Sequence, residues 1–553
     1  MSVDYLSRAR DFLLHEQQFH LGFLPTEQAN PLSASLEEDY LRDPAAGVRT
    51  LQRVDREVLK MAERVLASEQ FRGLQQALTI TLEQGGKVVF SGCGATGRLS
   101  ILLESMWRRA CRKYHCDKYA NSVFSIMTGG DYALVKSVES FEDFQRFGAE
   151  QVVEMGMQAG DLLIAITEGG ETSSVLGTVR EAISRGAQAF ILFNNPAELL
   201  VEHLERSRTV IRDPRVVVLD LFCGPMALAG STRMQATTSE QLVAGAALES
   251  TLCRFLNLPV PDYAEDFRRL LDALERPDSV AAIAAYTQFE AETYRRKGKI
   301  TYIADYFLLD IFTDTTERSP TFMLPPFRKN GDTQSVLSWA FVKHPFCSTP
   351  ATWERLFCRP LRCLSWQPAD YIRMNAGDRI VQNPPLISAA ELLKFPIGNE
   401  PNPERFAGEN DYAVLLTFAA EKIEYTASAR VKTLSLAAAD GDFSLPALPV
   451  CGGSSPLRLM DHLAVKLTLN TISTGTMVLL GRVSGNWMSW VDLSNKKLLD
   501  RGIRLIAQLG RLEYAAACEL LFKTMAEVEA RTKPGQERPP VVKVALQSLQ
   551  QNR

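Results

Sequence analysis

The 553-residue sequence contains no apolar run that approaches the roughly 18 residues of a membrane-spanning helix. Its first 19 residues are interrupted by charged side chains, so they lack the continuous apolar segment of a secretory signal. The formal net charge of −4 is small, which argues against a general nucleic-acid or membrane-surface role. We therefore expect a cytoplasmic protein that binds neither nucleic acid nor membrane.

The ten cysteines form no C-x-x-C pair. Cys111 and Cys116 form one close pair and Cys358 and Cys363 another, with His115 the only histidine near either. This spacing does not match a zinc site, so the sequence predicts reduced thiols, no metal and no cofactor. The six histidines also lie outside the loops described below, which disfavours an aldose–ketose isomerase that uses a histidine.

A glycine-rich turn is the most informative local feature of the sequence. Residues 87–98 read as a short β-branched strand, a turn rich in glycine and the start of an apolar-periodic helix. Such a turn presents backbone N–H groups and a positive helix end to an anion. The glycine spacing also fits a dinucleotide-binding loop, and a strand-to-helix turn without a ligand is a third interpretation.

A second loop rich in hydroxyl groups separates these interpretations. Residues 161–166 form another apolar strand, followed by Thr167-Glu-Gly-Gly-Glu-Thr-Ser-Ser174 and a new helical pattern. In a doubly wound sheet the two loops meet at the carboxyl ends of the strands, which suits one phosphate ester. No strand ending in an acidic residue follows the glycines at the interval that a dinucleotide needs. Simple helix caps remain an alternative for both loops.

Strands and helices alternate along most of the chain, which predicts an α/β protein with parallel sheets. Expected strands of the first half cover residues 88–91, 122–128, 162–166, 189–193 and 216–219, and those of the second half cover 299–304, 336–342, 412–418 and 431–436. Closing helices are expected at 240–256 and 461–480, the second interrupted at 473–475. The turn after Ala304 contains no glycine, so a duplicated fold with one phosphate site, in the first half, is predicted.

Several segments in the same order resemble the sugar isomerase (SIS) domain family. They are residues 24–31, 91–98, 129–131 with 138–143, 230–234, 466–475 and 480–486. The resemblance is to the branch that contains N-acetylmuramic acid 6-phosphate etherase and glucokinase regulatory protein. It implies two flavodoxin-like SIS domains with a C-terminal helical cap. We divide the chain into an N-terminal arm (1–44), a first SIS domain (45–275), a second (276–505) and the cap (506–553).

The resemblance implies a sugar phosphate ligand, of the fructose phosphate or N-acetylmuramic acid 6-phosphate class. It places Gly94, Thr96, Gly97 and Arg98 in the first loop and Thr167, Gly169, Glu171 and Thr172 in the second, with Lys466 reaching the site from the second domain. Glu139 matches a family carboxylate that lies over the sugar. Without the resemblance, Glu139 and Lys466 fit solvated surface residues, and Arg98 fits a structural ion pair equally well.

One departure from the etherase pattern bears on catalysis. The position of the etherase's acidic proton donor holds Met106, which cannot donate a proton. Glu317 of the second domain is the expected substitute if the chain is an enzyme. The first hypothesis is therefore a phosphosugar-binding regulatory protein with a sugar kinase as its possible partner. The alternative is an etherase-like carbon–oxygen lyase that uses Glu139 and Glu317.

Overall fold

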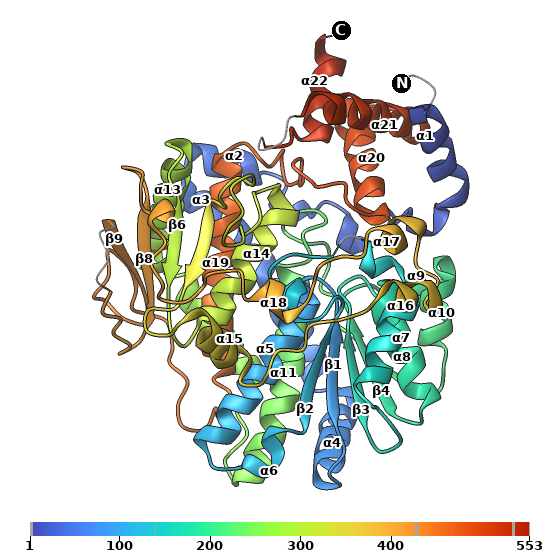
Figure 1. The fold of residues 1–553 in the computed structure, drawn as a ribbon. Helices are drawn as coiled ribbons and strands as arrows, with labels where there is room; N and C mark the ends of the chain where they lie inside the picture. The colour runs from blue at the N-terminus through green and yellow to red at the C-terminus, as the bar shows by residue number, and fades with distance from the viewer. Residues whose placement is uncertain (1–3, 139, 426–429, 533–536, 552–553) are drawn as a thin grey trace.

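The computed structural model describes residues 4–138, 140–425, 430–532 and 537–551, which form two parallel five-stranded sheets with helices around them (Figure 1). The first sheet has the strand order β2-β1-β3-β4-β5. Its strands are β1 (Val88–Gly92), β2 (Val123–Met127), β3 (Leu162–Ile166), β4 (Gln188–Phe193) and β5 (Val216–Asp220). All five lie within two residues of their predicted positions.

The second sheet repeats this plan with the order β10-β9-β8-β6-β7. Its strands are β6 (Ile300–Ile303), β7 (Ala340–Lys343), β8 (Tyr412–Phe418), β9 (Arg430–Leu436) and β10 (Phe443–Leu445). Numbered within each half, both sheets read 2-1-3-4-5, so the predicted duplication is confirmed. β7 is shorter than the predicted 336–342, and the three-residue β10 was not predicted.

Alternate side chains of the central strands enter different cores, as expected for a sheet covered on both faces. Val88 and Phe90 of β1 pack into the large core, whereas Val89 between them packs into a second core. The strands therefore read as continuous apolar runs, because both faces are buried. The helices of this half are α3 (Pro44–Leu66), α4 (Glu69–Glu83), α5 (Ala95–Lys113), α6 (Asp117–Ala120), α7 (Gln145–Glu154), α8 (Ser173–Ser184), α9 (Ala197–His203), α10 (Glu205–Ile211) and α11 (Gln235–Leu256).

The second half contributes α12 (Tyr263–Leu274), α13 (Pro277–Arg295), α14 (Leu308–Phe322), α15 (Thr349–Phe357), α16 (Pro368–Arg373), α17 (Asp378–Gln382), α18 (Ala389–Leu392) and α19 (Leu459–Leu479). The predicted interruption of the last helix is wrong, because α19 is continuous through residues 473–475. A Cβ at Gly475 would lie 2.4 Å from the Tyr40 hydroxyl oxygen. The glycine thus permits close helix packing rather than a break.

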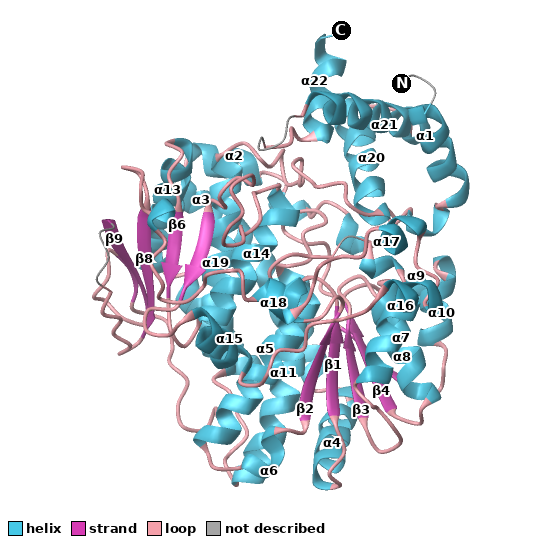
Figure 2. Cartoon of the chain, in the orientation of Figure 1, coloured by secondary structure: helices cyan, strands magenta, loops and turns pink. Residues whose placement is uncertain are grey.

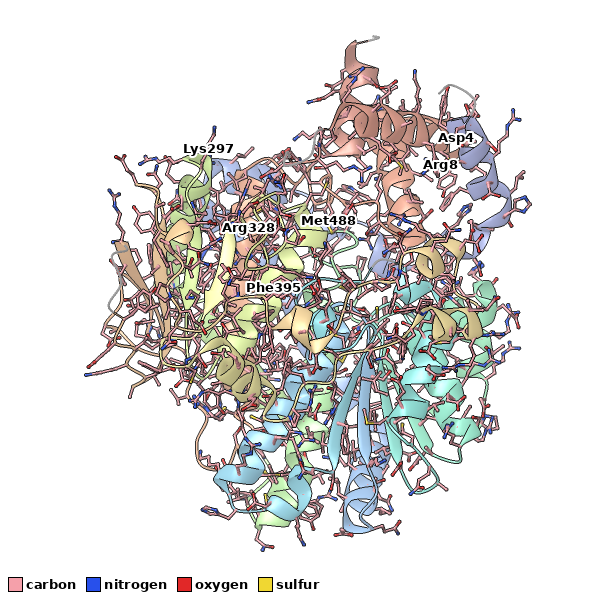
Figure 3. The ribbon with its side chains drawn as sticks, viewed as in Figure 1. Asp4, Arg8, Lys297, Arg328, Phe395 and Met488 are labelled. Carbon is pink, nitrogen blue, oxygen red and sulfur yellow. The ribbon has the colours of Figure 1, made fainter. Side chains whose placement is uncertain are left out.

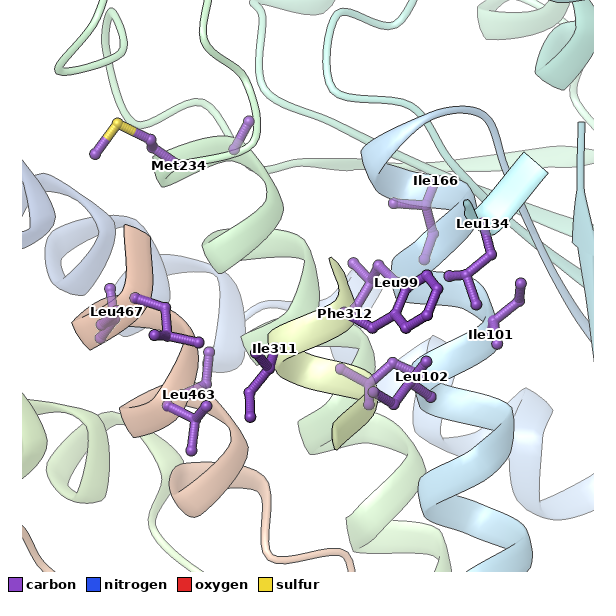
Figure 4. Packing of buried hydrophobic residues seen from close by; sticks show 14 of the residues in the cluster. Leu99, Ile101, Leu102, Leu134, Ile166, Met234, Ile311, Phe312, Leu463 and Leu467 are labelled. Atoms are coloured by element: carbon purple, nitrogen blue, oxygen red, sulfur yellow. The ribbon is translucent and has the colours of Figure 1, made fainter. Parts of the chain in front are cut away.

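The two halves share one core. Leu99 and Leu102 of α5 pack beside Phe312 of α14 (Figure 4). α14 also contacts α19, and α11 contacts α19, so helices of both halves meet between the sheets. This packing brings the middle of α14 to the carboxyl end of the first sheet.

A cap of α20 (Lys496–Gly510), α21 (Tyr514–Arg531) and α22 (Val541–Gln551) joins the N-terminal arm, whose helices are α1 (Asp4–His15) and α2 (Leu36–Arg42) (Figure 2). α1 packs against α21 (Figure 1). Burial alone would raise the pKa of Glu27 in the arm. The positive charges of Arg501 and Arg504 of α20 outweigh this effect and lower the pKa to about 2. The predicted domain boundary at residue 505 falls inside α20.

Six short 3-10 helices complete the fold, at Gln17–Phe19, Pro25–Glu27, Pro31–Ser33, Asp131–Leu134, Phe141–Asp143 and Pro403–Arg405. Within the described residues, no helix has the length and apolar character that a membrane crossing requires.

Candidate functional site

The first loop begins where β1 ends and carries its glycines for two different reasons. A Cβ at Gly92 would lie 2.4 Å from the carbonyl carbon of Thr96, so only glycine allows the chain to fold back so closely. Gly94 precedes α5 with φ +57°, a conformation that glycine adopts readily. A Cβ there would meet nothing within 4 Å, because Gly94 faces open space. The loop therefore exposes backbone at the start of α5.

Two predicted residues of this loop serve its structure. The Thr96 hydroxyl accepts a hydrogen bond from the Cys93 N–H at 3.0 Å and donates to the Cys93 carbonyl at 2.9 Å. A Cβ at Gly97 would lie 2.7 Å from the Met127 side chain, so this glycine packs α5 onto the sheet. Neither residue lines the cavity described below.

The second loop places Thr172 at the start of α8. The Thr167 hydroxyl lies 3.2 Å from the Thr172 hydroxyl, and the Gly169 carbonyl accepts a hydrogen bond from Asn195 at 3.0 Å. Glu171 turns away and pairs with Lys497 at 2.7 Å and Arg206 at 3.4 Å. Burial raises the pKa of Glu171, but Lys497 and Arg206 outweigh it and lower the pKa.

A cavity of about 730 Å³ joins the two loops. It lies at the carboxyl ends of β1 and β3, where the strand order reverses and ligands of open α/β sheets bind. Its size is typical of a small-molecule site. The lining includes residues 93–95, Arg98, residues 135–138 and 140–142, Glu168, Thr172, residues 230–233, Thr316, Glu317, Met488, Ser494, Asn495, Lys497 and Arg501. Met488 marks its position in the middle of the molecule (Figure 3).

Both domains and the cap thus build this cavity. α14 of the second half supplies Glu317, whose carboxylate accepts a hydrogen bond from the Arg98 guanidinium. Arg98 Nε also donates to the Thr316 hydroxyl and the Leu134 carbonyl, both at 3.0 Å. Arg98 is therefore a buried link between α5, α14 and the cavity wall, although part of it faces the cavity.

Lys466 lies beside the cavity rather than in its lining. Its ammonium donates to the carbonyls of Arg233 and Met234 at 3.1 and 3.2 Å and to the Thr238 hydroxyl at 2.8 Å. It does not line the large cavity but an adjoining space of about 30 Å³, which shares Ala95, Arg233 and Glu317 with that cavity. Burial, with Arg233 nearby, lowers the pKa of Lys466 to about 7. Its hydrogen bonds are made within the protein, and the predicted contact of Lys466 with a ligand at the first loop stays a prediction.

Glu142 and Glu168 are the carboxylates with shifted pKa values in the cavity. Burial raises the pKa of Glu142 to about 7, with Asp143 adding to the effect and Lys497 opposing it. Burial likewise raises the pKa of Glu168 to about 7, again against Lys497. Each is half protonated near neutral pH, which is the property that a general acid or base needs. The predicted catalytic residue Glu139 lies outside the described residues, and its neighbours Val138 and Ser140 line the cavity.

The turn after the first strand of the second half differs from the glycine-rich loop of the first half. Asp305 follows β6 where the first half has its glycine-rich loop, and its carboxylate accepts hydrogen bonds from Arg355 at 2.8 Å and His344 at 3.0 Å. Side chains of the protein itself, Asp305 with Arg355 and His344, therefore fill the place that corresponds to the first loop. The described residues contain no group of three or more histidine, cysteine or acidic side chains arranged to hold a metal ion.

Comparison with known proteins identifies the family. Residues 72–183 match the model of the glucokinase regulatory protein N-terminal SIS domain. An N-acetylmuramic acid 6-phosphate etherase of Aliivibrio fischeri (strain MJ11) is 30% identical over 224 residues, which are 40% of this chain and 67% of that protein. The chain belongs to this SIS-domain family. A Nostoc etherase is 33% identical over 222 residues, 40% of this chain and 65% of the relative.

Solved structures with a similar arrangement are more distant. The C-terminal domain of a Francisella tularensis glucosamine-fructose-6-phosphate aminotransferase has 10% identity and a TM-score of 0.41, and covers 79% of this chain and 96% of its own. A putative phosphosugar isomerase from Silicibacter pomeroyi has 13% identity and a TM-score of 0.38, and covers 78% and 99%.

Within this SIS site, four predicted residues line the cavity: Gly94, Arg98, Thr172 and Glu317. Lys497 was not predicted, although its ammonium lies among them. In the sequence it follows another lysine in an amphipathic helix, where a lysine is normally exposed. One signal distinguishes Lys497 from Lys496: the residue spacing places Lys497, Arg501 and Arg504 on one face of α20.

Proposed function

We propose that this chain binds a phosphosugar in the 730 Å³ cavity and acts as a regulatory protein similar to glucokinase regulatory protein. The observation that supports it best is the convergence of two helix N-termini and one partly buried ammonium on a single cavity. The backbone at Gly94 and Ala95, the start of α8 at Thr172 and the Lys497 ammonium all line it. Helix N-termini and a lysine are suited to a phosphate dianion.

The rest of the cavity is suited to a sugar. Glu142 and Glu168 line it together with the hydroxyl-bearing residues Ser137, Ser231 and Thr232. Carboxyl groups with a pKa near 7 both donate and accept hydrogen bonds at neutral pH, which matches the mixed character of sugar hydroxyls. The Ser231 hydroxyl is buried and has no hydrogen-bond partner among the described residues, so a ligand hydroxyl would satisfy it.

A regulatory role is supported by the way three parts of the chain line one cavity. The first domain supplies the phosphate loops, α14 supplies Glu317 and α20 supplies Lys497. A ligand that contacts all three parts favours the conformation in which they lie together. A partner protein that distinguishes this conformation from others would then sense the ligand. A sugar kinase as that partner and a cytoplasmic location belong to this proposal. The ten free thiols are consistent with a reducing compartment.

An etherase-like lyase is the second candidate, and the carboxylates of the cavity favour it. Glu142 and Glu168 supplement the predicted pair of Glu139 and Glu317, and the curated relatives are N-acetylmuramic acid 6-phosphate etherases. Met106, at the etherase's acidic position, lies in the hydrophobic core of α5 and not in the cavity. Its identity therefore has no direct bearing on whether a proton donor is present.

Two assays separate these candidates. Calorimetric titration with glucose 6-phosphate, fructose 6-phosphate and N-acetylmuramic acid 6-phosphate, each against its unphosphorylated sugar, measures binding. Lactate release from N-acetylmuramic acid 6-phosphate measures turnover. Phosphate-dependent binding without turnover supports the regulator, whereas turnover above about 1 s⁻¹, within the ordinary enzyme range, favours the lyase. Equal binding of phosphorylated and free sugars refutes both.

A further inference from the structure

The connection between β7 and β8 leaves its own sheet and crosses to the first domain. It spans residues 344–411 and includes α16, which lies beside α7 of the first half (Figure 1), where Arg373 pairs with Glu150 at 2.8 Å. We define the strap as residues 359–373 of this connection. We define the cavity wall as residues 129–138 and 140–142, many of which line the phosphosugar cavity.

The strap grips one end of the wall through a buried carboxylate. Arg359 donates two hydrogen bonds to Asp131, at 2.7 and 2.8 Å, and the Arg362 N–H donates a third at 2.5 Å. The Asp131 N–H in turn donates to the Arg362 carbonyl at 3.1 Å. Asp131 and Arg359 are both buried, so these charge-assisted bonds are not weakened by solvent.

Glycine makes this contact possible. Gly130 has φ +71°, and a Cβ there would lie 3.0 Å from both the Arg362 carbonyl oxygen and the Leu364 nitrogen. The strap backbone therefore runs directly against the wall backbone. Glu104 of α5 completes the contact, because it accepts hydrogen bonds from Arg359 at 3.1 Å and from Arg362 at 2.9 and 3.0 Å.

The strap grips the other end of the wall through aromatic rings. Trp366 stacks on Phe141 with ring centroids 6.0 Å apart, and Tyr371 meets the same ring edge-on at 6.1 Å. Trp366 Nε1 also donates to Glu154 of α7 at 2.5 Å. Phe141 is followed by Glu142, so this contact lies directly behind a cavity carboxylate.

Between these two contacts the wall has little regular structure of its own. Its described residues contain only two short 3-10 helices, one of which extends to Asp143. The inner side is held by Arg98, which donates to the Leu134 carbonyl and pairs with Glu317. Both ends of the wall are thus held by residues of the second half, and the inner contact is made by Arg98, whose partner Glu317 belongs to that half.

We propose that the strap positions the cavity wall, so that docking of the strap and binding of the phosphosugar are thermodynamically coupled. Asp131 and Trp366 are positioning residues: they act on the ligand through the wall and do not touch it. The inference rests on the proposed function. By linkage, whatever loosens the strap weakens ligand binding, and the ligand tightens the strap by the same factor. A partner that engages the outer side of the strap would thereby alter ligand affinity.

Variants at each end of the wall test the coupling. Asp131→Asn removes the charge of the first contact, and Trp366→Ala removes the ring of the second. Each is expected to weaken glucose 6-phosphate or fructose 6-phosphate binding about fivefold or more, the lower end of typical coupling between sites. Trp366→Phe keeps a ring against Phe141 and should restore most of the affinity, which a general loss of stability would not allow.

The matched control is Ile372→Ala. Ile372 lies on the same strap, but it is 63% exposed. Its removal should leave the dissociation constant within about twofold of the wild-type value, as for an ordinary surface substitution. Thermal melting of every variant shows that the compared proteins are folded.

Hydrogen exchange of the unaltered protein gives a measurement that does not depend on any variant. Peptides covering residues 359–373 should exchange more slowly when the sugar phosphate is bound. Unchanged strap exchange together with wild-type affinity in both folded variants would overturn the coupling while leaving the proposed function intact. A wild-type protein that binds none of the sugar phosphates would instead overturn the proposed function, and the coupling with it.

Discussion

Replacing Lys497 by methionine is expected to weaken sugar phosphate binding by about 10- to 150-fold. Lys497 is one of the cationic residues that line the cavity, and its ammonium lies 2.7 Å from Glu171 of the second loop. A hydrogen bond to a charged group contributes about 1.5–3 kcal/mol, and each 1.4 kcal/mol is tenfold in the dissociation constant.

A second effect acts in the same direction. In the unaltered protein, burial opposes the charged form of Lys497, but Glu171 and Glu27 outweigh this and raise its pKa. Without the ammonium, Glu171 keeps Arg206 at 3.4 Å as its cation, and its negative charge acts more strongly on an incoming phosphate. Methionine preserves the length and the apolar stem, so the packing of α20 is retained.

Calorimetric titration of the folded variants with glucose 6-phosphate measures the effect. Lys496→Met is the matched control, since its ammonium pairs with Glu16 at 2.6 Å and its side chain is 40% exposed. The control should bind as the wild-type protein does. Wild-type affinity in Lys497→Met, or an equal loss in both variants, would refute the assignment of Lys497 to the ligand.

Three further predictions concern titratable groups. Burial raises the pKa of Glu168 from 4.5 to about 7, so between these pH values the folded state holds a proton that the unfolded state has lost. The free energy of unfolding should therefore fall as the pH rises from 4.5 to 7. Glu168→Gln should remove this fall, which denaturant titration measures. Burial lowers the pKa of Lys466 from 10.5 to about 7, so wild-type stability should rise relative to Lys466→Met between pH 7 and 10.5, by up to about 1.4 kcal/mol per unit. A constant stability difference across either window would contradict that assignment. If lactate release from N-acetylmuramic acid 6-phosphate is detected, Glu142→Gln should reduce it about 10²- to 10⁴-fold, and an unchanged rate would show that Glu142 is not an acid or base.

The strands of both sheets were largely predictable because buried parallel strands are continuous apolar runs bounded by turns. Residues 162–166 and 412–418 were predicted with their observed bounds. β10 has only three residues, too few for a periodic signal. The predicted break in α19 was wrong because the sequence does not show that Gly475 contacts Tyr40 from a helix more than 400 positions away.

The site was predictable only where the signal is local. Gly94 and Thr172 follow strands directly and precede helices, so the loops that they belong to were recognised. Lys497 enters the cavity from a cap helix more than 300 residues beyond the second loop, and only tertiary packing places it there. The hydrogen-bond partners of Lys466, the carbonyls of Arg233 and Met234, belong to the first half and could not be predicted for the same reason.

Binding of a phosphosugar in the cavity between the two loops is the central claim. Its most direct test is calorimetric titration of the unaltered protein with a hexose 6-phosphate and with the corresponding free hexose. The account predicts saturable binding of the phosphate ester, one ligand per chain, because the turn at Asp305 is occupied by Arg355 and His344. The free hexose should bind far more weakly. Equal affinity for both sugars, or no binding of any hexose phosphate, would contradict it.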